Sequence, residues 1–165
     1  MLYKFIQLLF WGLFCAIVLY PILHEFGHSI AIIICGGKVC NIVLFPLPNI
    51  LCNMNQRSAP QLIFIGVAGN IIPTMLSLVL QPKHFIFFYM NTIIKVICIL
   101  AFVISAVGLI GNIPLLKMQD DFVRLSNIGG SKILLLSFCV ILIILLTISI
   151  EKSKPFKKLY LYFDF

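Results

Sequence analysis

The stretch that decides the fold is residues 5–35, which read FIQLLFWGLFCAIVLYPILHEFGHSIAIIIC. The run is longer than the roughly 20 apolar residues that cross a bilayer as a helix. Its charged residue is Glu25, which lies between two histidines. A carboxylate within such a segment is costly and usually functional. The run therefore predicts a membrane span with a polar centre that needs a chemical explanation.

The rest of the chain has the same apolar character. Of its 165 residues, 62% are hydrophobic and 10% are charged, and the mean hydropathy is +1.15. Soluble domains are roughly half apolar, and disordered chains are poorer still in apolar residues, so both classes are excluded. Further apolar runs at 61–80, 85–116 and 133–150 are each long enough to cross a bilayer. We expect an all-α transmembrane fold with about four spans.

The organisation along the chain predicts one integral-membrane core over residues 1–150 and a basic, aromatic juxtamembrane tail over 151–165. The first run is too long for one perpendicular crossing, so tilt, a kink at Pro21 or extension beyond the membrane must absorb the excess. After it, residues 39–45 favour β structure, and two prolines follow. A short strand or hairpin fits this segment, and its edge could pair with an extended peptide. A compact connector is the alternative.

Charge and cysteine content exclude other functions. The formal net charge is +7, but the basic residues are spread between apolar runs, as in loops that meet lipid headgroups. Nucleic acid is therefore not an expected partner. The six cysteines contain no C-x-x-C pair, so we interpret them as packing residues. A bridge among Cys35, Cys40 and Cys52 is left open.

The sequence His24-Glu25-Phe26-Gly27-His28 follows the H-E-x-x-H pattern. Helical residues four apart share a face, so His24 and His28 can present both imidazoles to one zinc ion. Glu25 then lies where a carboxylate can take a proton from a water on the metal. This segment predicts two zinc ligands and a general base.

Such a site needs a third protein ligand. His84 begins the third run beside Lys83, which is typical of an interfacial residue. Asp120 and Asp121 follow the end of that run, where a carboxylate could fold back onto the first helix. These two acidic residues are the better candidates.

At these residues the sequence resembles the site-2 proteases, which are zinc metalloproteases that cleave peptide bonds within membranes. The first match is the motif at 24–28 together with the Gly-Gly-x-Val stretch at 36–39. Residues 66–70 are similar to the family's Gly-x-x-x-Asn helix, with Val67 in place of the usual proline. Residues 112–120 resemble the family's Asn-x-x-Pro stretch leading to Asp-Gly, although Pro114 is one position early and Asp121 replaces the glycine.

The resemblance implies a three-helix catalytic core that holds one zinc ion per chain within the membrane. Some relatives carry a PDZ domain, but this sequence leaves no room for one, so we expect a minimal form. Its metal ligands would be His24, His28 and a carboxylate. Counting from Asn112 favours Asp120 as that carboxylate, with Asp121 as the alternative.

Two asparagines have two interpretations each. Asn70 could hold substrate or stabilise an oxyanion, or it could form a hydrogen bond between closely packed helices. Asn112 could act in the same way, or it could cap the broken end of the third run.

The resulting hypothesis is a zinc metalloendopeptidase that hydrolyses peptide bonds in or near transmembrane segments of membrane proteins. In this mechanism Glu25 is the catalytic base and later the proton donor to the leaving amine. We expect a multi-pass protein of the cell membrane of a prokaryote. The alternative is a non-catalytic membrane protein that uses the same zinc site for metal handling or regulation, and Glu25→Gln separates the two. A channel or transporter is disfavoured because polar residues do not recur along one face.

Overall fold

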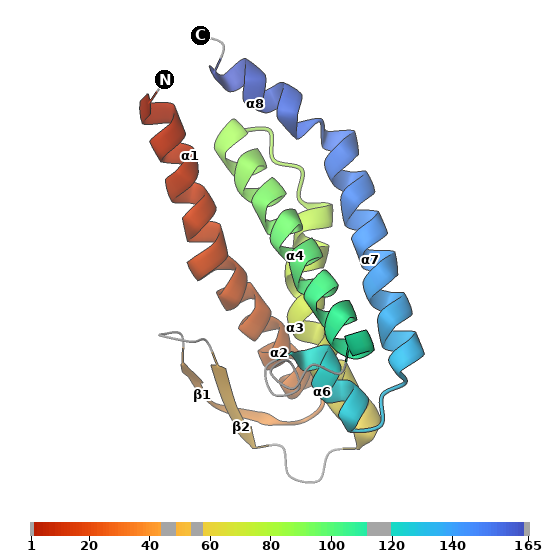
Figure 1. The fold of residues 1–165 in the computed structure, drawn as a ribbon. Helices are drawn as coiled ribbons and strands as arrows, with labels where there is room; N and C mark the ends of the chain where they lie inside the picture. The colour runs from red at the N-terminus through yellow and green to blue at the C-terminus, as the bar shows by residue number, and fades with distance from the viewer. Residues whose placement is uncertain (1, 44–48, 54–57, 112–119, 164–165) are drawn as a thin grey trace.

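The computed structural model describes residues 2–43, 49–53, 58–111 and 120–163. In this part of the chain, four helical stretches are long and apolar enough to cross a membrane. The helices are α1 Leu2–Phe14, the π-helical turn η1 Cys15–Leu19, α2 Tyr20–Ile34, α3 Ala59–Val79, α4 Phe85–Gly111, α6 Asp121–Asn127, α7 Lys132–Ser153 and α8 Pro155–Phe163. The strands are β1 Lys38–Val43 and β2 Asn49–Asn53. The predicted all-helical transmembrane class with four spans is confirmed (Figure 1).

The first span consists of α1, η1 and α2 in one continuous helical stretch. The π-helical turn ends at Leu19, two residues before Pro21, and the Tyr20 amide donates to the Cys15 carbonyl, five residues back. Proline lacks an N–H, and its ring crowds the carbonyl four residues earlier, which a widened turn relieves. A kink at Pro21 was one of the three ways in which the sequence could absorb the excess length, and the structure has a π-helical turn just before this residue.

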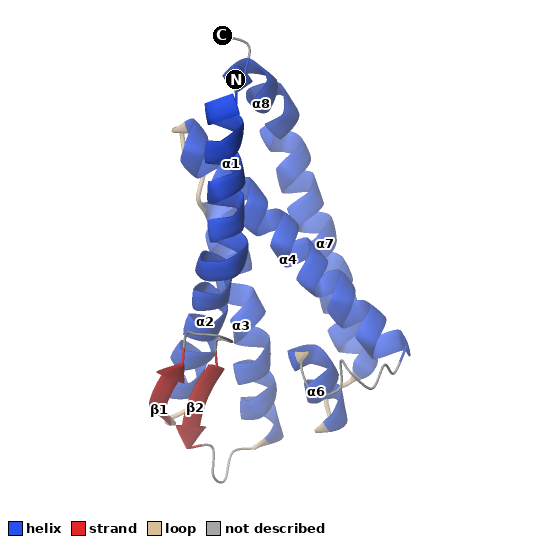
Figure 2. Cartoon of the chain, turned by 60° about the vertical axis from the view of Figure 1, so that its left-hand side comes forward, coloured by secondary structure: helices blue, strands red, loops and turns tan. Residues whose placement is uncertain are grey.

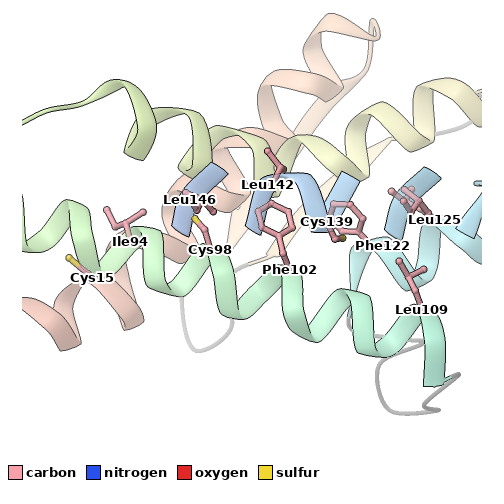
Figure 3. Packing of buried hydrophobic residues seen from close by; sticks show 11 residues of the cluster. Cys15, Ile94, Cys98, Phe102, Leu109, Phe122, Leu125, Cys139, Leu142 and Leu146 are labelled. Carbon is pink, nitrogen blue, oxygen red and sulfur yellow. The ribbon is translucent and has the colours of Figure 1, made fainter. Parts of the chain in front are cut away.

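The main apolar core joins α4, α6 and α7 and includes Cys15 from η1 (Figure 3). At its centre Phe102 is fully buried and meets Phe122 edge to face, with ring centroids 6.0 Å apart. Phe122 in turn stacks on Phe138 of α7. The buried thiols of Cys15, Cys98 and Cys139 belong to this core, as expected of packing cysteines. The core fixes the short helix α6 between the long spans.

The connection after the first span is a β-hairpin, which confirms the predicted β element. Gly36 ends α2 with a φ of 72°, and the Gly37 amide donates to the Ile32 carbonyl, which is the usual glycine-dependent helix stop. Strands β1 and β2 pair antiparallel from Lys38 opposite Asn53 to Val43 opposite Asn49. Figure 2 shows the hairpin at the end of the bundle away from both chain termini. Residues 44 and 45 of the predicted strand, and the Cys52 side chain, lie outside the described residues.

The hairpin packs on a second, small apolar cluster between α2 and α3. Its buried members are Ala31, Ile32, Ile65 and Ala68, and Val39 and Ile50 of the strands pack against them. The two helices approach closely, since a Cβ at Gly27 would collide with the Ala68 carbonyl oxygen. This close contact holds the H-E-x-x-H segment directly against α3.

Of the tail predicted over 151–165, residues 151–153 continue α7 and residues 155–163 form the helix α8. Lys154, with a left-handed φ of 49°, and then Pro155 separate it from α7. Tyr162 anchors it to two spans. Its hydroxyl donates to the Gln7 side-chain carbonyl of α1, and its ring stacks on Phe85 at the start of α4. Both chain ends therefore lie at one end of the bundle, as an even number of spans requires (Figure 1).

Candidate metal centre

His24 and His28 lie on successive turns of α2 and present their rings to the same side. Their Nε2 atoms are 3.1 Å apart, and the ring planes are nearly perpendicular, at 88°. This is the juxtaposition that the spacing of four residues predicts for a helix.

Asp121, the first residue of α6, completes the cluster. Its Oδ2 atom lies 3.1 Å from Nε2 of His24 and 3.2 Å from Nε2 of His28. The three atoms thus form a nearly equilateral triangle. A tetrahedral zinc ion with bonds of roughly 2.0–2.1 Å holds neighbouring ligand atoms about 3.3 Å apart. The triangle therefore matches one face of such a coordination sphere, with the fourth position open.

Asp120 is used differently, although it is adjacent in sequence. One of its carboxylate oxygens accepts from the Val123 amide at 3.0 Å and so caps α6, and the other accepts from the Ser105 hydroxyl at 2.7 Å. The register of the sequence match favoured Asp120 as the metal ligand. The structure instead brings Asp121 to the histidines, because the cap turns Asp120 toward α4.

The outer hydrogen bonds orient the two histidines. Nδ1 of His28 lies 2.8 Å from the Ile65 carbonyl oxygen, so Nδ1 carries the proton and Nε2 keeps a lone pair for a metal. Nδ1 of His24 is buried and has no hydrogen-bond partner among the described residues. A bound cation would contact His24 through Nε2, and this contact does not depend on which group forms a hydrogen bond with Nδ1.

The site is partly shielded from water. The side chains of His24, His28 and Asp121 are 20%, 13% and 19% exposed, so they are sheltered but reachable. Burial by itself raises the pKa of the Asp121 carboxyl, but the two imidazoles beside it outweigh this effect and hold the pKa well below its ordinary value. Asp121 therefore carries a negative charge at neutral pH, as a carboxylate ligand of a metal would.

Gly69 of α3 makes room for the histidine rings. A Cβ at this position would collide with the imidazoles of both His28 and His24. In one of the two interpretations of this region, the small residues beside Asn70 allow close packing between helices. The structure gives Gly69 a more specific role, because the two histidine rings occupy the space that a side chain at this position would fill.

Asn70, the next residue, is buried and accepts a hydrogen bond at 3.0 Å from the Tyr20 hydroxyl, so it joins α3 to α2. Tyr20 lies one turn before His24, and the two ring centroids are 6.0 Å apart. The sequence reasoning did not select Tyr20, although its spacing of four from His24 was the available signal. The pair places a hydroxyl and an amide beside the proposed ligands.

The remaining candidates differ in position. Glu25 is half-buried on α2, and within the described part of the chain its carboxylate makes no hydrogen bond or ion pair. It is adjacent to His24, and no described residue binds its carboxylate away from the histidines. Asn112 lies outside the described residues. His84 is exposed and contacts the Phe87 ring, as an interfacial residue does.

The fold and the site together define a multi-pass membrane protein of the metallopeptidase class. The family described as Peptidase M50B-like matches residues 10–116. The chain belongs to this family, which confirms the resemblance to the site-2 proteases. His24, Glu25 and His28 lie within the matched segment, and Asp121 follows it. No curated protein and no solved structure matches the chain.

Proposed function

We propose that this protein is a zinc-dependent intramembrane endopeptidase that hydrolyses peptide bonds in or near transmembrane segments of other membrane proteins, in the cell membrane of a prokaryote. The observation that carries the proposal is the triangle formed by Nε2 of His24, Nε2 of His28 and Oδ2 of Asp121. Two imidazoles and one carboxylate are a donor set typical of catalytic zinc.

His24, His28 and Asp121 would hold the zinc ion, which would supply Lewis acidity and lower the pKa of a water molecule toward neutral pH. Glu25 is the base that accepts the proton of the attacking water and then delivers it to the leaving amine. Its half-buried carboxylate suits this role, because within the described residues no partner holds it away from the site.

Tyr20 and Asn70 are placed to position the substrate. The hydrogen bond from the Tyr20 hydroxyl to the Asn70 side-chain carbonyl orients the Asn70 amide, whose N–H groups can donate to a peptide carbonyl. This arrangement combines the two interpretations of Asn70, since a bond between helices can also aim the amide.

The substrate must be locally extended before it is cut, since a helix within lipid has its backbone groups satisfied internally. The outer edges of the two-stranded hairpin offer backbone groups to such a segment. The hairpin packs on the same pair of helices that holds the histidines and Gly69. We therefore propose transmembrane segments with helix-weakening residues as the substrate class.

The peptidase activity can be tested before any substrate has been identified. Membranes from cells that produce the wild type or Glu25→Gln are compared for new protein N-termini by mass spectrometry, and zinc is measured on both purified proteins. We expect cleavage products that depend on Glu25, and equal zinc contents. Equal sets of N-termini with equal zinc would contradict the peptidase proposal and support the alternative, a membrane protein that uses zinc for metal handling or regulation.

A further inference from the structure

A large basic cavity lies at the end of the bundle opposite the metal centre. It has a volume of about 1050 Å³ and is bounded by the ends of α3 and α7, the start of α4, and α8. Figure 1 shows these segments together near both chain termini, whereas α6 and the hairpin lie at the other end. The cavity is therefore separate from the proposed peptidase site.

Lys95 forms the inner part of the cavity. It is 6% exposed and lies ten residues into α4, which places it about 15 Å along the helix from its start. Its ammonium donates to the Ser149 hydroxyl of α7 at 2.8 Å, the one partner that the described residues give it. An ammonium has three N–H donors, so it can still donate to another acceptor. A charge at such a position in a span is costly and usually serves a function.

The other charged residues that line the cavity indicate that it favours an anionic ligand. Further lysines surround the mouth, and none of the lining residues is acidic: the basic residues are Lys83, Lys152, Lys154, Lys157 and Lys158. These cations repel one another when no anion is present, so a bound anion relieves the repulsion. Lys158 also lies over the Phe88 ring, 3.7 Å from its centroid, which keeps its charge at the cavity wall.

The walls are apolar. Leu78 of α3 and Leu145 and Ile148 of α7 line the cavity between the lysines, and these helices are membrane spans. A site with a basic mouth, a deep ammonium with a free donor and apolar walls is complementary to an amphiphile with a phosphate headgroup.

We propose that this cavity binds an acidic phospholipid, with the headgroup phosphate accepting from Lys95 and the mouth lysines and with the acyl chains along the leucine-lined walls. The phosphate chemistry alone would also suit inorganic phosphate, but the apolar walls within the spans favour the lipid. Lipid binding here does not depend on the proposed peptidase activity.

The test uses the full chain in nanodiscs that contain phosphatidylcholine and phosphatidylglycerol, followed by native mass spectrometry of the lipids that remain bound. We expect the wild type to retain phosphatidylglycerol preferentially. Lys95→Gln should lower this retention about tenfold, as the loss of a charged hydrogen bond implies. The double variant Lys152→Gln/Lys157→Gln, with both changes at exposed positions, should lower it without disturbing folding.

Two controls make the test specific. Lys132→Gln removes an exposed lysine from the opposite end of α7 and should retain the lipid like the wild type, as should Glu25→Gln. Thermal unfolding with inorganic phosphate distinguishes the two sources of phosphate, since the lipid should raise the unfolding midpoint and phosphate alone should not. Three results would overturn the proposal. The wild type would retain both lipids equally, Lys95→Gln and the double variant would retain phosphatidylglycerol like the wild type, or phosphate alone would stabilise the protein as much as the lipid does.

Discussion

Nε2 of His28 lies 3.2 Å from Oδ2 of Asp121, although the spans α3 and α4 separate the two residues in the chain. The contact joins the first span to the short helix α6, which the apolar core holds against α4 and α7. A metal at this contact would cross-link the two parts of the bundle, so metal binding and stability should be coupled.

Removal of the metal is therefore expected to lower the thermal stability of the wild type. At free zinc about 100-fold above its dissociation constant, binding adds about 2.7 kcal/mol to the free energy of unfolding. Thermal unfolding in detergent, with and without a chelator, measures the difference. His24→Ala should unfold at the same temperature in both conditions, and a chelator effect of equal size in this variant would exclude the site.

The two adjacent aspartates should respond differently to the same substitution. Asp121→Asn removes the anionic ligand and is expected to weaken zinc binding by about 100-fold or more, beyond the effect of losing an outer hydrogen bond. Asp120→Asn is the matched control, since asparagine also caps helices well and should leave zinc binding intact. Zinc titration of both purified variants measures the two affinities. Weaker zinc binding by Asp120→Asn than by Asp121→Asn would indicate Asp120 as the ligand.

Glu25→Gln should separate chemistry from metal binding. Glutamine keeps the size of the side chain but cannot accept a proton, so cleavage is expected to fall by about 10²- to 10⁴-fold. The zinc content should stay at the wild-type level. Cleavage of a substrate found by the N-terminus comparison, measured in nanodiscs, provides the rate. A variant that cleaves at the wild-type rate would remove Glu25 from the mechanism.

Gly69→Ala should damage the metal centre through a single added methyl group. The Cβ collides with both imidazoles, so we expect lower zinc occupancy and a loss of about 1–3 kcal/mol in the free energy of unfolding. Gly12→Ala is the control, because its Cβ would meet only the Tyr89 hydroxyl end at 3.1 Å, which can shift. Zinc content of the two variants is the measurement, and equal contents would show that the rings can move aside.

Tyr20→Phe should break the hydrogen bond to Asn70 and cost about 0.5–1.5 kcal/mol of stability. The single variants Tyr20→Phe and Asn70→Ala, compared with the double variant, isolate the coupling between the two side chains. If the bond also aims the Asn70 amide at substrate, Tyr20→Phe lowers the cleavage rate while zinc content stays constant. Additive effects on stability would argue against the bond.

The sequence by itself determined the features that depend on local spacing and on hydrophobicity. Apolar runs of sufficient length defined the spans, because a bilayer requires a minimum helix length. The spacing of His24 and His28 put two ligands on one face, because a helix repeats every 3.6 residues. The β-prone residues 39–45 indicated a strand or hairpin after the first span, because side chains of this kind fit a pleated strand.

The tertiary structure decided the features that depend on how separate segments meet. Consecutive residues at the start of a helix point in different directions, so the choice between Asp120 and Asp121 rested on the cap of α6 and on the packing of Phe122 in the core. The roles of Gly69 and Tyr20 likewise require the contact between α2 and α3. The basic cavity is assembled from lysines of the third and fourth spans and of segments beside them. A local sequence pattern does not predict these contacts, because they depend on how distant segments pack against one another.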